Sequence, residues 1–124
     1  MTLVDTSSWI HFLRRGGKAT VKKRVRDALV DGSAVTCPVI LSELWMGAAS
    51  EKDRKDVQEL QDVLHCLSIE QETWKLAYQL ARSCCANGTP VPSTDLIIAA
   101  CAFFHGASIE TEDKHFAVLQ RYYP

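Results

Sequence analysis

The sequence predicts an α/β fold in which helices cover both faces of a central parallel sheet of about four or five short strands. Two observations predict it: short apolar segments alternate with helical segments along the chain, and Gly or Pro separates many of them. The 124 residues are 47% hydrophobic and 23% charged, a composition that excludes disordered, collagen-like and coiled-coil chains. We therefore expect a single domain over residues 1–124.

The first strand and helix are predicted by a change from apolar residues to an acid and hydroxyl residues. Leu3 and Val4 form a short apolar strand that stops at Asp5. The hydroxyl residues at 6–8 can cap a helix that begins near Trp9, and a pair of glycines ends it. A second, amphipathic helix comes next, with apolar residues at helical spacing on one side.

The middle of the chain repeats this alternation. Residues 34–37 are predicted to form a second strand, and Pro38 suits the first turn of a helix that runs toward Gly47. An amphipathic helix at 51–64 and a third strand at 66–69 follow.

The last third of the chain contains the most apolar helix. A helix at 70–86 ends at Gly88, which can adopt a left-handed conformation. Ser93 or Thr94 can cap the next helix, which is apolar on all sides up to Gly106 and must therefore be buried. The remaining elements are a strand at 107–109 and a short helix or loop at 115–119.

Four acids stand where a strand passes into a helix or within the first turns of a helix: Asp5, Glu43, Asp95 and Asp113. The carboxyl ends of parallel strands share one edge of the sheet, where ligands bind, so these acids can converge there. Clustered carboxylates raise one another's pKa unless a cation compensates them. Oxygen ligands without histidine or thiolate favour Mg²⁺ or Mn²⁺ over zinc.

Each acid also has a purely structural interpretation. Asp5 can cap a helix, Asp95 can interact with a helix dipole, and Asp113 can lie in a solvated acidic turn. Glu43 is harder to explain in this way, because its neighbours are apolar and an unpartnered charge is seldom buried.

Four short motifs occur in order along the chain. They are Val4-Asp5-Thr6-Ser7, Leu41-Ser42-Glu43-Leu44, Ser93-Thr94-Asp95-Leu96-Ile97-Ile98-Ala99-Ala100 and Thr111-Glu112-Asp113-Lys114-His115-Phe116. Together they resemble a PIN domain, and specifically the VapC-type ribonuclease toxins of toxin–antitoxin pairs. The resemblance implies a PIN-like three-layer α/β/α fold.

The resemblance also implies an activity, a metal and partners. The chain would be an endoribonuclease that hydrolyses RNA phosphodiesters, the toxin of a type II toxin–antitoxin pair. Asp5, Glu43, Asp95, Asp113 and Thr111 would be catalytic. The four acids would hold Mg²⁺, with Mn²⁺ as the alternative, and Thr111 would form hydrogen bonds around them. The implied partners are an antitoxin that inserts an arginine into the acidic cleft, and a second copy of the chain in a homodimer.

One position departs from the family pattern. Glu112 lies between Thr111 and Asp113, where a basic or neutral residue is more usual, and Glu110 adds further negative charge. Either glutamate can compete as a ligand, which makes Asp113 the least certain of the four acids.

Positive charge is concentrated in one stretch that contains no acid. Its members are Arg14, Arg15, Lys18, Lys22, Lys23, Arg24 and Arg26. A solvated helix face is the usual explanation, and a surface for RNA phosphates is the alternative. The formal net charge of -1 does not indicate a nucleic-acid binder by itself.

The remaining composition bears on location. Five cysteines without CxxC spacing indicate reduced thiols in the core of a cytoplasmic protein, and neither a secretion signal nor a membrane span is expected. The four histidines show no metal-binding spacing.

Three other classes of protein compete with the nuclease. A receiver-like Mg-binding signalling domain would have adjacent acids after its first strand, and a haloacid-dehalogenase phosphatase would have Asp where Ser7 stands. A non-catalytic module whose acidic cleft binds a partner's arginine remains open as an alternative.

Overall fold

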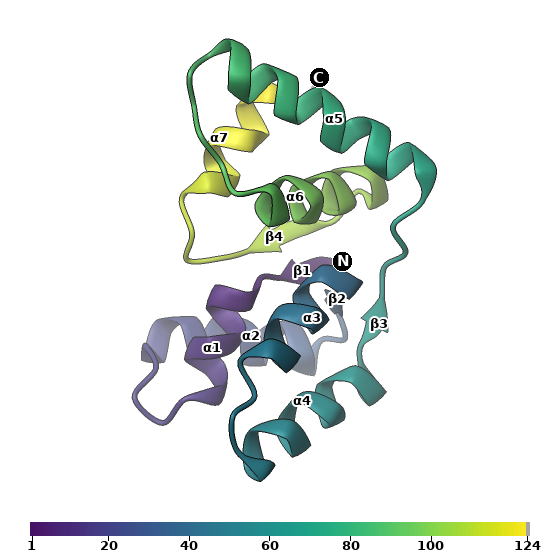
Figure 1. Cartoon of the computed structure of the whole chain (residues 1–124). Coiled ribbons are helices and arrows are strands. Elements are labelled where there is room, and N and C mark those ends of the chain that lie inside the picture. The colour runs from purple at the N-terminus through teal and green to yellow at the C-terminus, as the bar shows by residue number, and fades with distance from the viewer. Residues whose placement is uncertain (124) are drawn as a thin grey trace.

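Four parallel strands form the centre of the computed structural model, which describes residues 1–123 (Figure 1). They are β1 (Thr2–Val4), β2 (Ala34–Thr36), β3 (His65–Cys66) and β4 (Ser108–Glu110), in the spatial order β3-β2-β1-β4. Leu3 on β1 is aligned with Val35 on β2 and with Ile109 on β4. The predicted parallel sheet is confirmed, and β1 lies inside it with a partner on each side.

Seven helices of the described chain lie on the two sides of the sheet, so that helices, sheet and helices form three layers. They are α1 (Thr6–Leu13), α2 (Ala19–Val30), α3 (Pro38–Met46), α4 (Glu51–Val63), α5 (Gln71–Ala86), α6 (Ser93–His105) and α7 (His115–Tyr122). α5, α6 and α7 pack together on one side of the sheet, above it in Figure 1, and α1 packs against α2. Each crossover between neighbouring strands contains helices, as parallel strands require.

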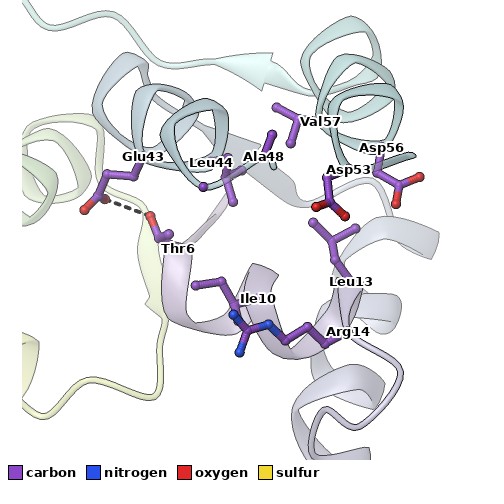
Figure 2. Close-up of a pocket in the computed structure, with 11 residues that line it drawn as sticks. Thr6, Ile10, Leu13, Arg14, Glu43, Leu44, Ala48, Asp53, Asp56 and Val57 are labelled. Atoms are coloured by element: carbon purple, nitrogen blue, oxygen red, sulfur yellow. Dashed lines mark hydrogen bonds between the residues drawn. The ribbon is translucent and has the colours of Figure 1, made fainter. Parts of the chain in front are cut away.

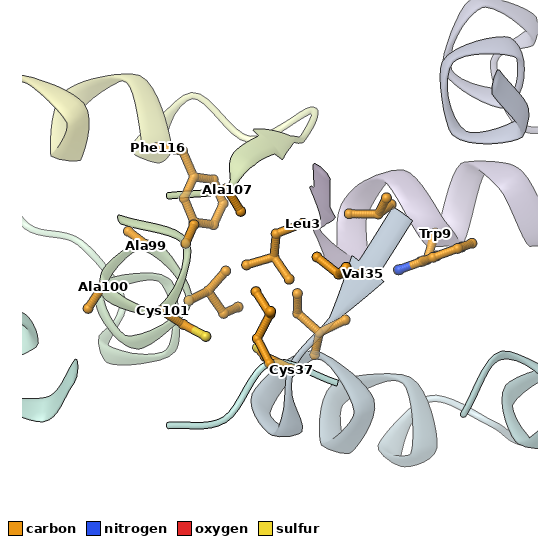
Figure 3. Packing of buried hydrophobic residues seen from close by; sticks show 14 of the residues in the cluster. Leu3, Trp9, Val35, Cys37, Ala99, Ala100, Cys101, Ala107 and Phe116 are labelled. Atoms are coloured by element: carbon orange, nitrogen blue, oxygen red, sulfur yellow. The ribbon is translucent and has the colours of Figure 1, made fainter. Parts of the chain in front are cut away.

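The core is built where β1 and β2 meet α6. Leu3 is fully buried on β1, and Cys37 follows β2 at the start of α3 (Figure 3). Ala99, Ala100 and Cys101 of α6 are also fully buried. Small side chains on α6 allow this helix to approach the sheet closely, so α6 is the buried helix that its composition predicts.

Several element boundaries differ from the prediction by one to three residues, and hydrogen bonds explain two of these differences. α1 begins at Thr6 rather than near Trp9, because the backbone carbonyl of Asp5 accepts hydrogen bonds from the N–H groups of Ser8 and Trp9. β3 comprises only His65–Cys66 rather than 66–69, since one last bond from the Leu67 N–H to the Thr36 carbonyl ends its pairing with β2.

The turn between α1 and α2 depends on a glycine. A Cβ at Gly17 would lie 1.8 Å from the backbone oxygen of His11, so no other residue fits without moving the chain. Gly16, directly before it, has open space around its Cα. Gly17 thus sets how closely α2 follows α1.

The cysteines only partly follow the expectation of core thiols. Cys37, Cys84 and Cys101 are buried, whereas Cys66 and Cys85 are exposed, and all five are free. Within residues 1–123, no helix has the length and apolar character needed to cross a membrane.

Candidate active site

Asp5 lies at the carboxyl end of β1, and its side chain is only 4% exposed. Its Oδ2 accepts a hydrogen bond from Ser7 Oγ at 2.8 Å and another from Thr111 Oγ1 at 3.0 Å. Its backbone N–H donates to the Glu110 carbonyl at 2.9 Å, which fixes the start of α1 against β4. Hydroxyl groups therefore stabilise a buried carboxylate that would otherwise be strongly disfavoured.

Glu43 reaches the same region from α3, the helix that follows β2. Thr6 Oγ1 donates a hydrogen bond to Glu43 Oε1 at 2.8 Å (Figure 2). Burial raises the pKa of Glu43, the negative charges of Asp5 and Asp95 raise it further, and the bond from Thr6 opposes the increase.

Asp95 lies in the first turn of α6 and is 8% exposed. Burial is the main cause of its raised pKa, and the charges of Asp113 and Asp5 add to the increase. A hydrogen bond with His115 acts in the opposite direction.

Asp113 is held in the loop between β4 and α7. Its backbone N–H donates to Thr111 Oγ1 at 2.9 Å, and its Oδ1 accepts from the His115 backbone N–H at 2.9 Å. Because Thr111 Oγ1 also donates to Asp5, one hydroxyl connects the loop to the end of β1.

The four predicted acids meet at one edge of the sheet. The charges of Asp5 and Asp95 act on Glu43, and those of Asp5 and Asp113 act on Asp95, so electrostatic coupling links all four. Oxygen atoms of Asp95 and Asp113 and a ring nitrogen of His115 lie within 4.8 Å of one another. Oxygen donors dominate this set, which suits a hard divalent cation.

His115 is the residue at this site that the sequence analysis missed. Only its position, two residues after Asp113 at the start of a helix, could have indicated it.

The PIN domain family matches residues 2–122, almost the whole chain. The chain belongs to the PIN-domain family. Two curated relatives are VapC ribonuclease Mb1587 of Mycobacterium bovis and ribonuclease VapC11 of Mycobacterium tuberculosis. Each is 30% identical over 125 residues, which cover 98% of this chain and 92% of the relative.

Solved structures support the same fold for this PIN domain. FitAcB of Neisseria gonorrhoeae superposes with a TM-score of 0.81 at 20% identity, covering 98% of this chain and 94% of that one. The DNA-bound VapBC of Salmonella typhimurium superposes with a TM-score of 0.79 at 21% identity, covering 94% and 89%.

Glu110 and Glu112, the two additional glutamates of this PIN domain, are paired with basic side chains. Glu110 accepts hydrogen bonds from Ser8 Oγ at 2.8 Å and from Arg24 Nε at 2.7 Å. Glu112 lies 3.6 Å from Lys18 Nζ and 3.8 Å from Arg24 Nη2. Lys18 and Arg24 thus hold the two extra carboxylates against α2, and part of the basic stretch neutralises acids beside the site.

A groove of about 180 Å³ adjoins the acidic centre of the PIN domain between α1, α3 and α4 (Figure 2). Thr6 and Glu43 line the end of the groove that reaches the acids. Its remaining wall combines apolar and charged side chains, among them Ile10, Leu13, Arg14, Leu44, Asp53 and Val57.

Proposed function

We propose that this PIN domain is a metal-dependent endoribonuclease that hydrolyses RNA phosphodiesters and acts as the toxin of a type II toxin–antitoxin pair. The convergence of four carboxylates at the carboxyl edge of the sheet carries the proposal. Two relatives with 30% identity are named ribonucleases, which supports RNA as the substrate. The structural neighbours named VapBC and FitAB support an antitoxin partner.

The proposed ligands of the metal are Asp5, Glu43, Asp95 and Asp113. Within residues 1–123, no lysine or arginine forms an ion pair with any of them. Clustered carboxylates without a lysine or arginine partner fit a site for a divalent cation, because the neighbouring acids raise the pKa of Glu43 and of Asp95 beyond the effect of burial. The oxygen donors favour Mg²⁺ or Mn²⁺. When bound, such an ion supplies positive charge that holds a phosphodiester and favours deprotonation of water.

Thr111 has a positioning role in the proposal. Its hydroxyl donates to Asp5 Oδ2 and accepts from the Asp113 N–H, so it fixes the separation between these two acids. Thr6 orients Glu43 in a similar way through its 2.8 Å hydrogen bond. These hydroxyls prepare the carboxylates for a cation before substrate arrives.

The proposed protein partner is an antitoxin that inserts an arginine into the acidic cleft. A guanidinium group would supply the positive charge that these acids lack, and the groove beside Glu43 gives an approaching peptide apolar contacts.

We also propose that the chain forms a homodimer. The aromatic side chains of Trp74 and Tyr78 on α5 are exposed, which supports self-association. Residues 1–124 are proposed to act as one domain, because a single core cluster extends from Leu3 to Leu119.

The experiment is cleavage of a structured RNA pool by the purified chain without antitoxin. Reactions contain Mg²⁺, Mn²⁺ or EDTA, and Asp5→Asn is compared with Asp62→Asn. Asp62 is an exposed residue of α4 whose Oδ1 accepts a hydrogen bond from Gln58 of the same helix, and it lies outside the acidic centre, which makes it a matched control. Cutting that requires metal, persists in Asp62→Asn and falls at least about 100-fold in Asp5→Asn supports the nuclease. An absence of cutting by the folded protein in every condition would favour a non-catalytic arginine-binding module.

A further inference from the structure

The imidazole of His115 lies between two of the acids. Its Nδ1 is 2.9 Å from Asp95 Oδ2 and 3.0 Å from Asp113 Oδ1. The side chain is 34% exposed, so the ring is partly sheltered and still open to ions from solvent.

The backbone holds the ring in this place. The His115 N–H donates to Asp113 Oδ1, which fixes the first residue of α7 against the loop before it. The next residue, Phe116, is 4% exposed and anchors the same turn in the core. The backbone of His115 is therefore fixed at the start of α7, beside both acids.

His115 Nδ1 can interact favourably with both carboxylates in two ways. It can donate one N–H that the two oxygens share, or it can share a cation with them. The spacing fits both. A hydrogen bond between nitrogen and oxygen is about 2.9 Å long, and two adjacent ligands of an octahedral ion at about 2.1 Å are also separated by about 3.0 Å. The Nδ1 separations of 2.9 and 3.0 Å from Asp95 and Asp113 agree with either value.

We propose that His115 Nδ1 is a ligand of the divalent ion held by Asp95 and Asp113, and that this nitrogen makes the centre prefer Mn²⁺ to Mg²⁺. Imidazole is a common ligand of transition-metal ions, whereas Mg²⁺ binds oxygen almost exclusively. The inference rests on the proposed metal centre and adds the identity of one ligand and a preference between ions.

The test uses Mn²⁺ itself as the probe. Electron spin-echo spectroscopy of Mn²⁺ bound to the purified chain detects a directly coordinated ¹⁴N, and calorimetry measures the affinities for Mn²⁺ and Mg²⁺. His115→Asn is the informative variant, because its amide nitrogen can donate the hydrogen bond of Nδ1 but cannot coordinate as imidazole does. His65→Asn, at an exposed position on β3, is the matched control.

Nitrogen coupling in the wild type and in His65→Asn, but not in His115→Asn, is the expected result. Affinity for Mn²⁺ should fall roughly tenfold or more in His115→Asn, with a much smaller change for Mg²⁺. Bound Mn²⁺ without nitrogen coupling in the wild type would overturn the proposal, as would equal losses for both ions.

Circular dichroism of each variant checks the fold, and His115→Ala gives a second variant that removes both the donor and the ligand. Nitrogen-coupled Mn²⁺ binding without RNA cleavage would contradict the proposed nuclease and leave the ligand assignment intact. A folded chain that binds no Mn²⁺ would contradict both.

Discussion

Arg24 Nε lies 2.7 Å from Glu110 Oε1, which ties α2 to the end of β4 across 86 positions of the sequence. The other oxygen of Glu110 accepts from Ser8 Oγ, so this carboxylate joins two helices to the strand. Thr111, the next residue, is hydrogen-bonded to Asp5. The ion pair thus supports the loop that carries two of the proposed site residues, and it explains why an additional acid is tolerated there.

Replacing Arg24 by Gln should weaken this support. Glu110 would keep only its bond to Ser8, and its charge would act on the acidic centre and on approaching RNA. We expect stability in urea to fall by up to about 1 kcal/mol, because the arginine is partly exposed, together with a lower rate of RNA cleavage. Lys23→Gln is the control, since Lys23 pairs with Asp27 within α2. Equal effects of the two substitutions would contradict the special role of Arg24.

Glu43→Gln should raise the melting temperature of the metal-free protein. The substitution removes a charge that Asp5 and Asp95 repel, and its amide oxygen can still accept the bond from Thr6. A lower melting temperature in EDTA would indicate that the acids do not repel one another. With Mg²⁺ or Mn²⁺ present the ranking should reverse, because the wild type keeps one more charged ligand.

The raised pKa of Glu43 also predicts how the stability of the metal-free protein depends on pH. Since folding raises the pKa of Glu43, the folded protein binds this proton more tightly than the unfolded chain does. Its contribution to stability is therefore complete below the ordinary value of 4.5 and is lost as the pH rises through the higher pKa of the folded state. Melting temperatures in EDTA between pH 5 and pH 8 should fall more steeply for the wild type than for Glu43→Gln. Parallel curves would be the contrary result.

Thr111→Val should lower activity while preserving the shape of the side chain. The substitution removes the hydroxyl that donates to Asp5 and leaves the Asp113 N–H without its acceptor. The loss of an acceptor for a partly buried donor costs about 1–3 kcal/mol, which predicts a destabilised loop and slower cleavage. Thr20→Val on the exposed face of α2 serves as the control for the change of residue type. A wild-type rate of RNA cleavage in Thr111→Val would show that this hydroxyl has no role in the site.

Two adjacent glycines provide a test of the α1–α2 turn. Gly17→Ala would drive a Cβ into the His11 carbonyl, and relief of that overlap should cost about 1–3 kcal/mol. Gly16→Ala meets no atom and should leave stability unchanged or slightly increased. Urea unfolding of both variants measures the difference, and similar midpoints would show that the turn relaxes easily.

Much of the fold and part of the site could be predicted from the sequence. Alternating strands and helices determine a parallel sheet, and a parallel sheet places the residues after its strands at one edge. Asp5 and Glu43 follow neighbouring strands, and Asp95 and Asp113 lie on either side of β4 in the sequence. Local patterning and topology therefore grouped Asp5, Glu43 and Asp113, and Asp95 joined them as an acid in the first turn of a buried helix.

Only the tertiary structure decided which partners the remaining side chains have. Helical spacing places Arg24 on an outer face of α2, but it does not show that this face meets Glu110. The approach of His115 to Asp95, and the two-residue length of β3, likewise depend on how separate segments pack. Periodicity reports which face of an element is buried, whereas a specific pair of atoms at hydrogen-bond distance requires the positions of both elements in space.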